Sequence, residues 1–288
     1  MSARLALYDR VAEDAASIVI RSYSTSFSAA SRFLGADVRQ HVENIYALVR
    51  VADEIVDGGA EEAGLDLLAT TRQLNELERE TELAIEQGFS SNLIVHAFAL
   101  TAREVSFGAE LTAPFFESMR MDLSEKEHDQ ESFERYVYGS AEVVGLMCLC
   151  AFLHGHEVSD EQRAKFVHGA RALGAAFQKV NFLRDLADDF GTLGRSYFPG
   201  IDVASFTEAE KVRLLDDLDA DLRDATIGAQ LPASSRKAVA LAHSLFAQLS
   251  KRIRATPVSE LVKTRVRVPD AVKLRLAAAA AMGVTPRP

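Results

Sequence analysis

The chain is short of proline, cysteine and positive charge, and each shortage argues against a class of protein. No proline precedes Pro114, and this stretch is rich in Ala, Leu, Glu and Arg, which favours helices over strands. The two cysteines, Cys148 and Cys150, lie inside an apolar run, so we expect reduced, buried thiols rather than a disulfide framework. The net charge of −10 argues against sequence-independent nucleic-acid binding, which requires a basic surface.

Signals for export, membrane insertion and β-structure are also missing. Four charged residues between Asp9 and Asp14 interrupt the first apolar stretch, so it is not typical of a signal peptide and we expect a cytoplasmic protein. The most apolar stretch, Ser140 to Gly155, contains Glu142 and is shorter than the roughly 20 residues that a membrane span needs. We predict a buried helix there. Neither an alternating apolar pattern nor an internal repeat is visible.

Helical spacing of apolar residues is present along most of the 288 residues. Hydrophobic residues make up 48% and charged residues 26%, which suits a sizeable core in one all-α domain spanning residues 1–288. We predict breaks at 23–35, which is rich in serine, and at 191–205, which contains glycines and a proline. The predicted helices cover 5–21, 38–57, 65–87, 92–107, 114–123, 131–153, 160–190, 207–225, 233–254 and 270–282.

Positive charge is concentrated at the C-terminal end. From Lys251 onward there are nine Lys and Arg residues against two acids. This segment is interpreted either as a solvated terminus or as a basic, Ala/Leu-rich surface that contacts anionic lipid or a diphosphate. The second interpretation predicts peripheral contact with the inner face of a membrane.

Two Asp-x-x-x-Asp pairs, Asp53/Asp57 and Asp185/Asp189, are the first candidates for a site. On a helix this spacing places both carboxylates on one face, one turn apart, where like charges repel. A hard divalent cation would relieve the repulsion. Magnesium commonly binds through one or two carboxylates together with substrate phosphates.

The same spacing recurs at Asp217/Asp221, so a pair alone proves little. Its helix face carries Glu210, Arg213 and Asp224, a mixture of charges typical of a solvent-facing surface. We interpret this third pair as surface.

The surroundings of Asp53 and Asp57 favour a site. At about 100° per residue, Tyr46 and Arg50 share one polar stripe with the two acids. A cation and two acids that border a core can bind a metal and the anion that it carries. The alternative is a surface ion pair between Arg50 and Asp53. The neighbouring apolar stripe, which would face the core, consists of Ile45, Leu48, Val49, Ala52 and Val56.

Asp185 and Asp189 lie in a more apolar setting. Gln178 and Asn181 align with them, and Arg184 adds a cation beside the line. Polar groups on a buried helix are costly unless they are paired or liganded. A cavity that holds ions is therefore favoured over a satisfied polar seam between helices. The residues that make this helix apolar nearly all round are Phe177, Val180, Phe182, Leu183 and Leu186.

Taken together, four ordered segments resemble the squalene/phytoene synthase family. The matches run from about Tyr23 to Pro199, and the tail Arg265-Val-Arg267-Val-Pro269 has the same character. The four segments are Arg50-Val-Ala-Asp53-Glu-Ile-Val-Asp57, Tyr136-Val-Tyr138-Gly-Ser-Ala-Glu-Val-Val144-Gly145, Gln178-Lys-Val-Asn181-Phe-Leu-Arg184-Asp185-Leu-Ala-Asp188-Asp189 and Arg195-Ser-Tyr197-Phe-Pro199.

This resemblance implies a single-domain isoprenoid synthase fold with helices around a central cavity. Two aspartate motifs on opposing helices would hold Mg²⁺, or Mn²⁺ in its place, and grip two prenyl diphosphates. The implied metal ligands are Asp53, Asp57, Asn181, Asp185 and Asp189. The implied catalytic residues are these four aspartates together with Tyr46 and Tyr136. The implied substrate-binding residues are Ser24, Ser26, Phe27, Arg50, Gln178, Asn181, Arg184 and Tyr197.

The activity implied by the resemblance is head-to-head (1′-1) condensation of two geranylgeranyl diphosphates to phytoene, a step of carotenoid biosynthesis. Cleavage of a carbon–oxygen bond gives an allylic cation and diphosphate, whose charge metals and arginines neutralise. Aromatic faces such as Phe27 and Tyr136 stabilise a cation by roughly 0.5–2 kcal/mol each. A cyclopropyl diphosphate intermediate, a second ionisation, rearrangement and proton loss complete the reaction. It needs no NADPH.

Alternatives remain open within the family and outside it. Farnesyl diphosphate would give dehydrosqualene, or squalene after reduction by a nicotinamide, although we expect no C-terminal membrane anchor of the kind that squalene enzymes often carry. Small residues at Ala29, Ala30 and Ser31 leave room for a longer chain if they line the tunnel, which favours phytoene. Thr25 stands where the family often has a lysine, so Ser24 and Ser26 would be weaker phosphate contacts. A non-catalytic helical scaffold is the remaining alternative, and the sequence leaves the oligomeric state open.

Overall fold

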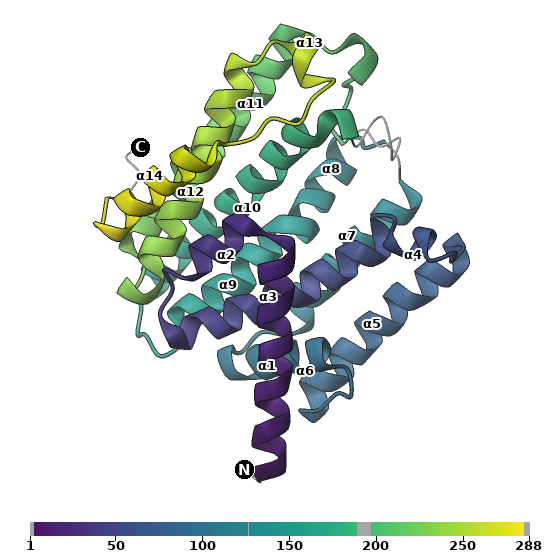
Figure 1. The fold of residues 1–288 in the computed structure, drawn as a ribbon, viewed down its shortest axis with the longest axis vertical. Coiled ribbons are helices and arrows are strands. Elements are labelled where there is room, and N and C mark those ends of the chain that lie inside the picture. Colours follow the sequence, from purple (N-terminus) through teal and green to yellow (C-terminus); the bar gives the residue numbers. More distant parts are fainter. Residues whose placement is uncertain (1–2, 126, 189–196, 285–288) are drawn as a thin grey trace.

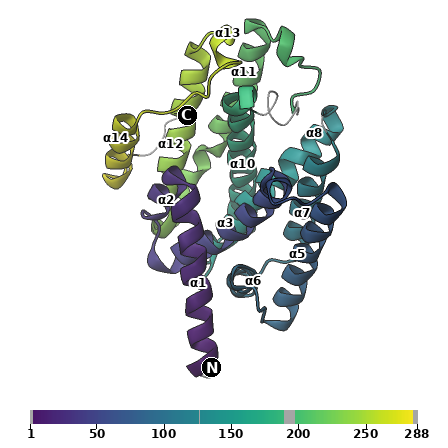
Figure 2. The same ribbon diagram turned by 45° about the vertical axis from the view of Figure 1, so that its right-hand side comes forward.

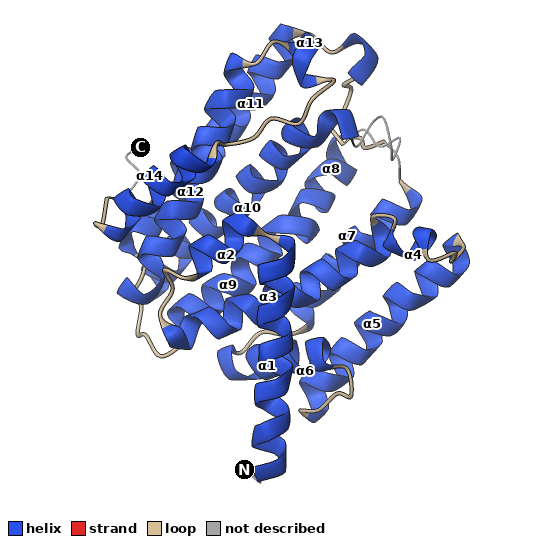
Figure 3. Ribbon diagram, viewed as in Figure 1, coloured by secondary structure: helices blue, strands red, loops and turns tan. Residues whose placement is uncertain are grey.

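The protein is a bundle of helices. The computed structural model describes residues 3–125, 127–188 and 197–284, and this part of the chain contains no β-strand (Figures 1 and 3). The predicted all-α fold is confirmed. Most predicted helices begin and end within a few residues of the observed ones, because apolar spacing marks the faces that pack together.

The N-terminal region contains one helix that the sequence did not predict. The expected break at 23–35 holds the two-turn helix α2, which begins after Ser24, whose hydroxyl accepts a hydrogen bond from the Phe27 amide at 3.1 Å. Helix α1 packs against α3 and α6, and its N-terminal end projects from the bundle (Figures 1 and 2). The bounds are α1 Ala3–Tyr23, α2 Thr25–Ser31 and α3 Ala36–Val56.

Helix α7 begins five residues earlier than predicted. The predicted helix starts at Pro114, yet Pro114 lies inside α7, although proline is best tolerated in the first turn of a helix. Buried Leu111, Phe115 and Phe116 on this helix fill the core, so packing extends the helix across the proline. The elements of this region are α4 Gly59–Glu62, α5 Leu67–Gln87, α6 Leu93–Val105 and α7 Ala109–Ser124.

A continuous helical stretch follows, close to the predicted 131–153. It consists of α8 (Gln130–Val137), the π-helical turn η1 (Tyr138–Glu142) and α9 (Val143–Leu153). By length and composition alone, this stretch could cross a membrane, and it is the one such helix in the described part of the chain. Half of its most apolar window is buried, and it packs against α10, α7 and α3, as the core helix of a globular bundle does.

Glycine allows η1 and α9 to approach their neighbours closely. A Cβ atom on Gly174 of α10 would lie 2.6 Å from the Ala141 carbonyl oxygen, and one on Gly145 would lie 2.7 Å from the Ala170 carbonyl oxygen. No larger residue fits there without a backbone shift. These contacts fix the wall that carries Tyr136 relative to the helix that carries the second aspartate motif.

The C-terminal half wraps around α10, which carries the second aspartate motif. A strap, defined here as residues 262–269, runs from α13 across the molecule to α14 (Figure 1). The described helices of this half are α10 Asp160–Asp188, η3 Val203–Ser205, α11 Glu208–Asp224, η4 Ala225–Gln230, α12 Ala233–Ala255, α13 Val258–Leu261 and α14 Asp270–Ala281.

Candidate active site

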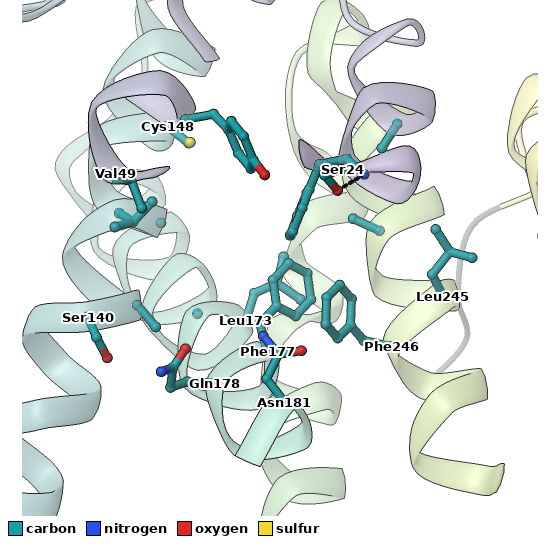
Figure 4. Close-up of a pocket in the computed structure, with 18 of the residues that line it drawn as sticks. Ser24, Val49, Ser140, Cys148, Leu173, Phe177, Gln178, Asn181, Leu245 and Phe246 are labelled. Carbon is teal, nitrogen blue, oxygen red and sulfur yellow. Dashed lines mark hydrogen bonds between the residues drawn. The ribbon is translucent and has the colours of Figure 1, made fainter. Parts of the chain in front are cut away.

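A cavity of about 1000 Å³ is lined by helices from both halves of the chain. Its size is at the upper end of the roughly 300–1000 Å³ typical of small-molecule sites. The two largest apolar clusters both contribute to its wall, one built on α10, α11 and α12 and the other on α3, α5, α6, α7 and α9. Figure 4 shows α10 side chains Phe177, Gln178 and Asn181 directed toward this space.

The cavity has a polar region and an apolar region. Side chains such as Ile20, Val49, Leu173 and Leu245 line the apolar region, which suits a hydrocarbon chain. The polar lining combines acids, arginines, amides and phenols from four different parts of the chain. It includes Arg50, Asp53, Asp57, Asp122, Tyr136, Gln178, Asn181, Arg184, Asp185, Tyr197 and Arg265.

The first aspartate motif lies on α3 as predicted. Tyr46, Arg50, Asp53 and Asp57 all line the cavity, and Asp57 follows the last residue of α3 as its C-cap. Burial, followed by repulsion from Asp57, raises the pKa of Asp53 to about 7, although Arg50 opposes the change. The raised pKa of Asp53, which lies beside the exposed Asp57, marks a carboxylate that is short of positive charge.

Arg50 does not form the surface ion pair with Asp53 that was the alternative interpretation of the sequence. Its guanidinium forms an ion pair with Glu54 rather than Asp53, and it stacks over the Tyr23 ring at 4.5 Å. The Arg50 Nε atom is buried without a hydrogen-bond partner. A buried, unpartnered donor on the cavity wall is suited to an anionic ligand.

The second aspartate motif lies on α10, where Gln178, Asn181, Arg184 and Asp185 line the cavity. The Asn181 Oδ1 atom is buried and has no hydrogen-bond partner. Asp189, the last member of this motif, lies outside the described residues.

Asp185 is held by two arginines. Arg184 donates to it from the neighbouring position, and Arg265 of the strap reaches it with a distance of 2.7 Å between Nε and Oδ1. The tail that carries Arg265 matches the family only loosely, so no firm role was predicted for this residue. Nothing local indicates its pairing with Asp185, 80 residues away.

Three side chains in the wall form a cluster that only the tertiary structure reveals. The Tyr136 and Tyr197 hydroxyls both donate hydrogen bonds to the Asp122 carboxylate. Burial, followed by the charge of Asp122, raises the pKa of Tyr136 well above its ordinary value. Asp122 belongs to none of the sequence motifs, so pattern reasoning had no signal for it.

Several aromatic rings surround Phe27, one of the predicted substrate-binding residues. Phe27 lies 6.0 Å from Tyr46 and 6.1 Å from Phe246, measured between ring centroids, and Phe246 stacks on Phe177 at 3.7 Å. Such faces suit both a polyene chain and a carbocation. The Ser24 side chain lines the cavity and caps α2 (Figure 4). The side chain of Ser26 lies outside the described residues.

The small residues that follow Phe27 divide between the cavity and solvent. Ala30 and Ser31 are buried and line the cavity, whereas Ala29 is exposed. The Ser31 hydroxyl donates to the Ser28 carbonyl at 3.1 Å and lies 3.5 Å from Glu43. Two of the three positions that we expected to leave room for a longer chain therefore border the tunnel.

The third aspartate pair, Asp217/Asp221, is not simply solvent-exposed. Lys179 of α10 donates to Asp217 at 2.5 Å and to Asp221 at 2.7 Å, and it joins α10 to α11. The Lys179 side chain is largely buried, so the interpretation of this pair as solvent-facing was wrong for Asp221, which is half-buried, while Asp217 is exposed. The lysine pairs with both acids, which weakens the case for a metal there.

The polar region of the cavity offers the kind of oxygen atoms that coordinate magnesium. Among the described residues, no three His, Cys, Asp or Glu side chains converge as a closed metal site. Magnesium does not need one, since it commonly binds through one or two carboxylates and substrate phosphates. Asp53 beside Asp57 and the unpartnered Asn181 oxygen supply hard oxygen donors. Their roles as ligands stay predictions.

Comparison with known proteins agrees with this geometry. The model of the squalene/phytoene synthase family matches residues 20–271. The chain belongs to this family. The sequence-based resemblance is thereby confirmed over more of the chain than its motifs alone covered.

Relatives within the family include bacterial phytoene synthases. The 15-cis-phytoene synthase of Pantoea ananas is 27% identical over 254 residues, which cover 80% of this chain and 78% of that protein. The 15-cis-phytoene synthase of a Paracoccus species is 27% identical over 271 residues, which cover 88% of this chain and 85% of that protein.

Solved structures show the same fold. A dehydrosqualene synthase bound to a ligand superposes with a TM-score of 0.78 at 21% identity and covers 96% of this chain and 97% of its own. A squalene synthase from Alicyclobacillus acidocaldarius gives a TM-score of 0.73 at 21% identity, with 90% and 97% coverage. The expected isoprenoid synthase fold is confirmed.

Proposed function

We propose that the protein condenses two geranylgeranyl diphosphates head to head to form phytoene. The observation that carries the proposal is one cavity whose wall combines many apolar side chains with polar residues of both aspartate motifs. Diphosphates would lie against the polar lining, and the prenyl chains against the apolar lining. Membership of the squalene/phytoene synthase family supports the reaction class.

Some residues of the polar region would bind the metal, and others would bind the diphosphate anion. Asp53 and Asp57 on one side, and Asn181 and Asp185 on the other, would hold Mg²⁺, with Mn²⁺ able to replace it. Bound magnesium would neutralise the departing diphosphate. Arg50, whose Nε atom has no partner, would donate to the same anion.

Aromatic side chains would act on the organic part of the substrate. Phe27, Tyr46 and Tyr136 line the cavity, where their ring faces can stabilise an allylic cation. The surrounding apolar wall excludes water that would otherwise capture the cation. Because phytoene formation involves no net reduction, NADPH has no part in the proposal.

The choice of the twenty-carbon substrate rests on two observations. Relatives named as phytoene synthases match most of the chain. Ala30 and Ser31, which line the cavity, occupy little of it. A fifteen-carbon substrate that gives dehydrosqualene is the second candidate, favoured by the structural similarity to a dehydrosqualene synthase.

The test is a product analysis. Purified protein is incubated with Mg²⁺ and either the twenty-carbon or the fifteen-carbon diphosphate, without a reductant, and the extracted hydrocarbon is identified by mass and ultraviolet spectrum. A forty-carbon conjugated triene is expected. A thirty-carbon product alone would keep the reaction and change the substrate. Absence of hydrocarbon from both, even with added NADPH, would leave a non-catalytic scaffold.

A peripheral contact with the inner face of a membrane is also part of the proposal. Leu274 of α14 is 73% exposed and Met282, which follows the last residue of this helix, is 77% exposed, with Arg275 next to Leu274. The basic C-terminal segment complements anionic lipid. Flotation with anionic vesicles should carry the wild type upward and leave Leu274→Glu behind. Leu68→Glu, at an exposed leucine on α5, is the matched control and should float.

A further inference from the structure

Asp122 of α7 is a carboxylate that the aspartate motifs leave unexplained. Its oxygen atoms accept the Tyr136 hydroxyl at 3.0 and 2.9 Å, and Oδ1 also accepts the Tyr197 hydroxyl at 3.2 Å. All three residues line the cavity. A charged acceptor shared by two phenols gives stronger hydrogen bonds than neutral partners give.

The cluster lies close to the first aspartate motif. The charge of Asp122 contributes to the raised pKa of Asp53, and the charge of Asp57 contributes to that of Tyr136. Asp122, Tyr136 and Tyr197 therefore belong to the same polar lining as the first aspartate motif, where substrate diphosphates, and the reacting carbons attached to them, would lie.

Packing fixes the two rings. Tyr197 stacks on Phe182 with 4.0 Å between ring centroids and an interplanar angle of 10°, and Tyr136 lies 5.8 Å from the same ring. Tyr136 is only 3% exposed. Neither ring can turn away without breaking this stack, so the bonds to Asp122 hold the phenols in one orientation.

The Tyr136 phenol is neutral in this setting, because burial and the adjacent carboxylate disfavour a phenolate. Its own proton points to Asp122. The phenol oxygen can still accept one further hydrogen. Such an oxygen is a poor base by itself, but it becomes an effective one when its proton can leave at the same time.

We propose that Asp122, acting through the Tyr136 hydroxyl, takes the proton that is lost in the last step of hydrocarbon formation. This proposal rests on the proposed function, and it names the group that accepts the proton in the final step of that reaction. Asp122 is a positioning and relay residue, since Tyr136 is the group that faces the substrate.

The step balances without any other reactant. A C–H bond beside the final carbocation breaks, and its electron pair forms the new carbon–carbon double bond. The proton passes to the Tyr136 oxygen while the Tyr136 proton passes to the Asp122 carboxylate. Once the product has left, the Asp122 carboxylic acid releases its proton to water.

The experiment measures hydrocarbon formed per diphosphate released, in the full chain with Mg²⁺ and the prenyl diphosphate. Asp122→Asn keeps an oxygen acceptor for the tyrosines but cannot take up a proton. We expect this ratio to fall about 100-fold, the low end of the contribution of a general base. Diphosphate release should fall far less, and prenyl alcohols from capture of the cation by water should replace the hydrocarbon.

Matched variants separate the relay from a structural role. Asp122→Glu retains a carboxylate and should recover part of the hydrocarbon yield. Tyr136→Phe keeps the ring and should give the same shift toward alcohols. Glu117→Gln removes a charge from an exposed position of the same helix and should leave the ratio unchanged.

Each result decides between the relay and its alternatives. A wild-type ratio in Asp122→Asn would overturn the relay. If thermal melting shows that Asp122→Asn does not fold, Tyr136→Phe decides in the same way. A wild type that forms no hydrocarbon refutes the proposed function itself, whereas an active wild type with unaffected variants refutes only the relay.

Discussion

Replacing Asp53 by asparagine should stabilise the metal-free protein. Burial and the repulsion from Asp57 raise the pKa of Asp53 from 3.8 to about 7 in the folded state. At 1.36 kcal/mol per pKa unit, the ionised Asp53 costs about 4 kcal/mol of folding free energy above pH 7. Because the side chain borders the cavity, solvent there screens the charge, and we expect about half of this, about 2 kcal/mol.

The sign of the pH dependence follows from the direction of this change. Between pH 3.8 and about 7 the folded protein binds a proton at Asp53 that the unfolded chain has released. The stability of the wild type therefore falls as pH rises through this window. Asp53→Asn should lack that part of the decline, so the two proteins should differ most above pH 7 and least below pH 4.

The assay is denaturant unfolding of both proteins from pH 5 to 8, with and without Mg²⁺ and a diphosphate analogue. Added ligands should stabilise the wild type and have less effect on Asp53→Asn. Asp217→Asn is the matched control, because Asp217 is exposed and paired with Lys179, and it should lose less than about 1 kcal/mol. A less stable Asp53→Asn at pH 8 would refute the reasoning.

Three further predictions concern the cavity wall and its packing. Ser31→Phe should narrow the tunnel and shift the product toward the shorter hydrocarbon in a competition between the two diphosphates, and an unchanged product ratio would count against the proposed chain-length control. Gly139→Ala should cost about 1–3 kcal/mol in denaturant unfolding, because its Cβ would lie 2.3 Å from the Pro114 carbonyl oxygen. Burial raises the pKa of Cys148 to about 12 and also raises that of Cys150, so both thiols should react far more slowly with a thiol reagent at pH 8 in the folded than in the unfolded protein. Equal rates in the two states would contradict this.

Local sequence predicted the helices well because a helix is specified by residues three and four apart. The apolar stripe beside Asp53 and the nearly all-apolar helix around Asn181 each identified a buried face. Where packing overrides local preference, prediction failed. The start of α7 was wrong because core side chains carry the helix across Pro114, and α2 was missed because its cap at Ser24 supports only two turns.

The same division applies to the site. The sequence by itself determined which residues could form an anion and metal site, because both aspartate motifs are local patterns on single helices. Only the tertiary structure decided that Arg265 reaches Asp185 and that Asp122 accepts two phenols from distant positions, Tyr136 and Tyr197. Such contacts depend on how helices cross, and this is set by interlocking side chains and close glycine contacts across the whole bundle. No window of neighbouring residues contains that information.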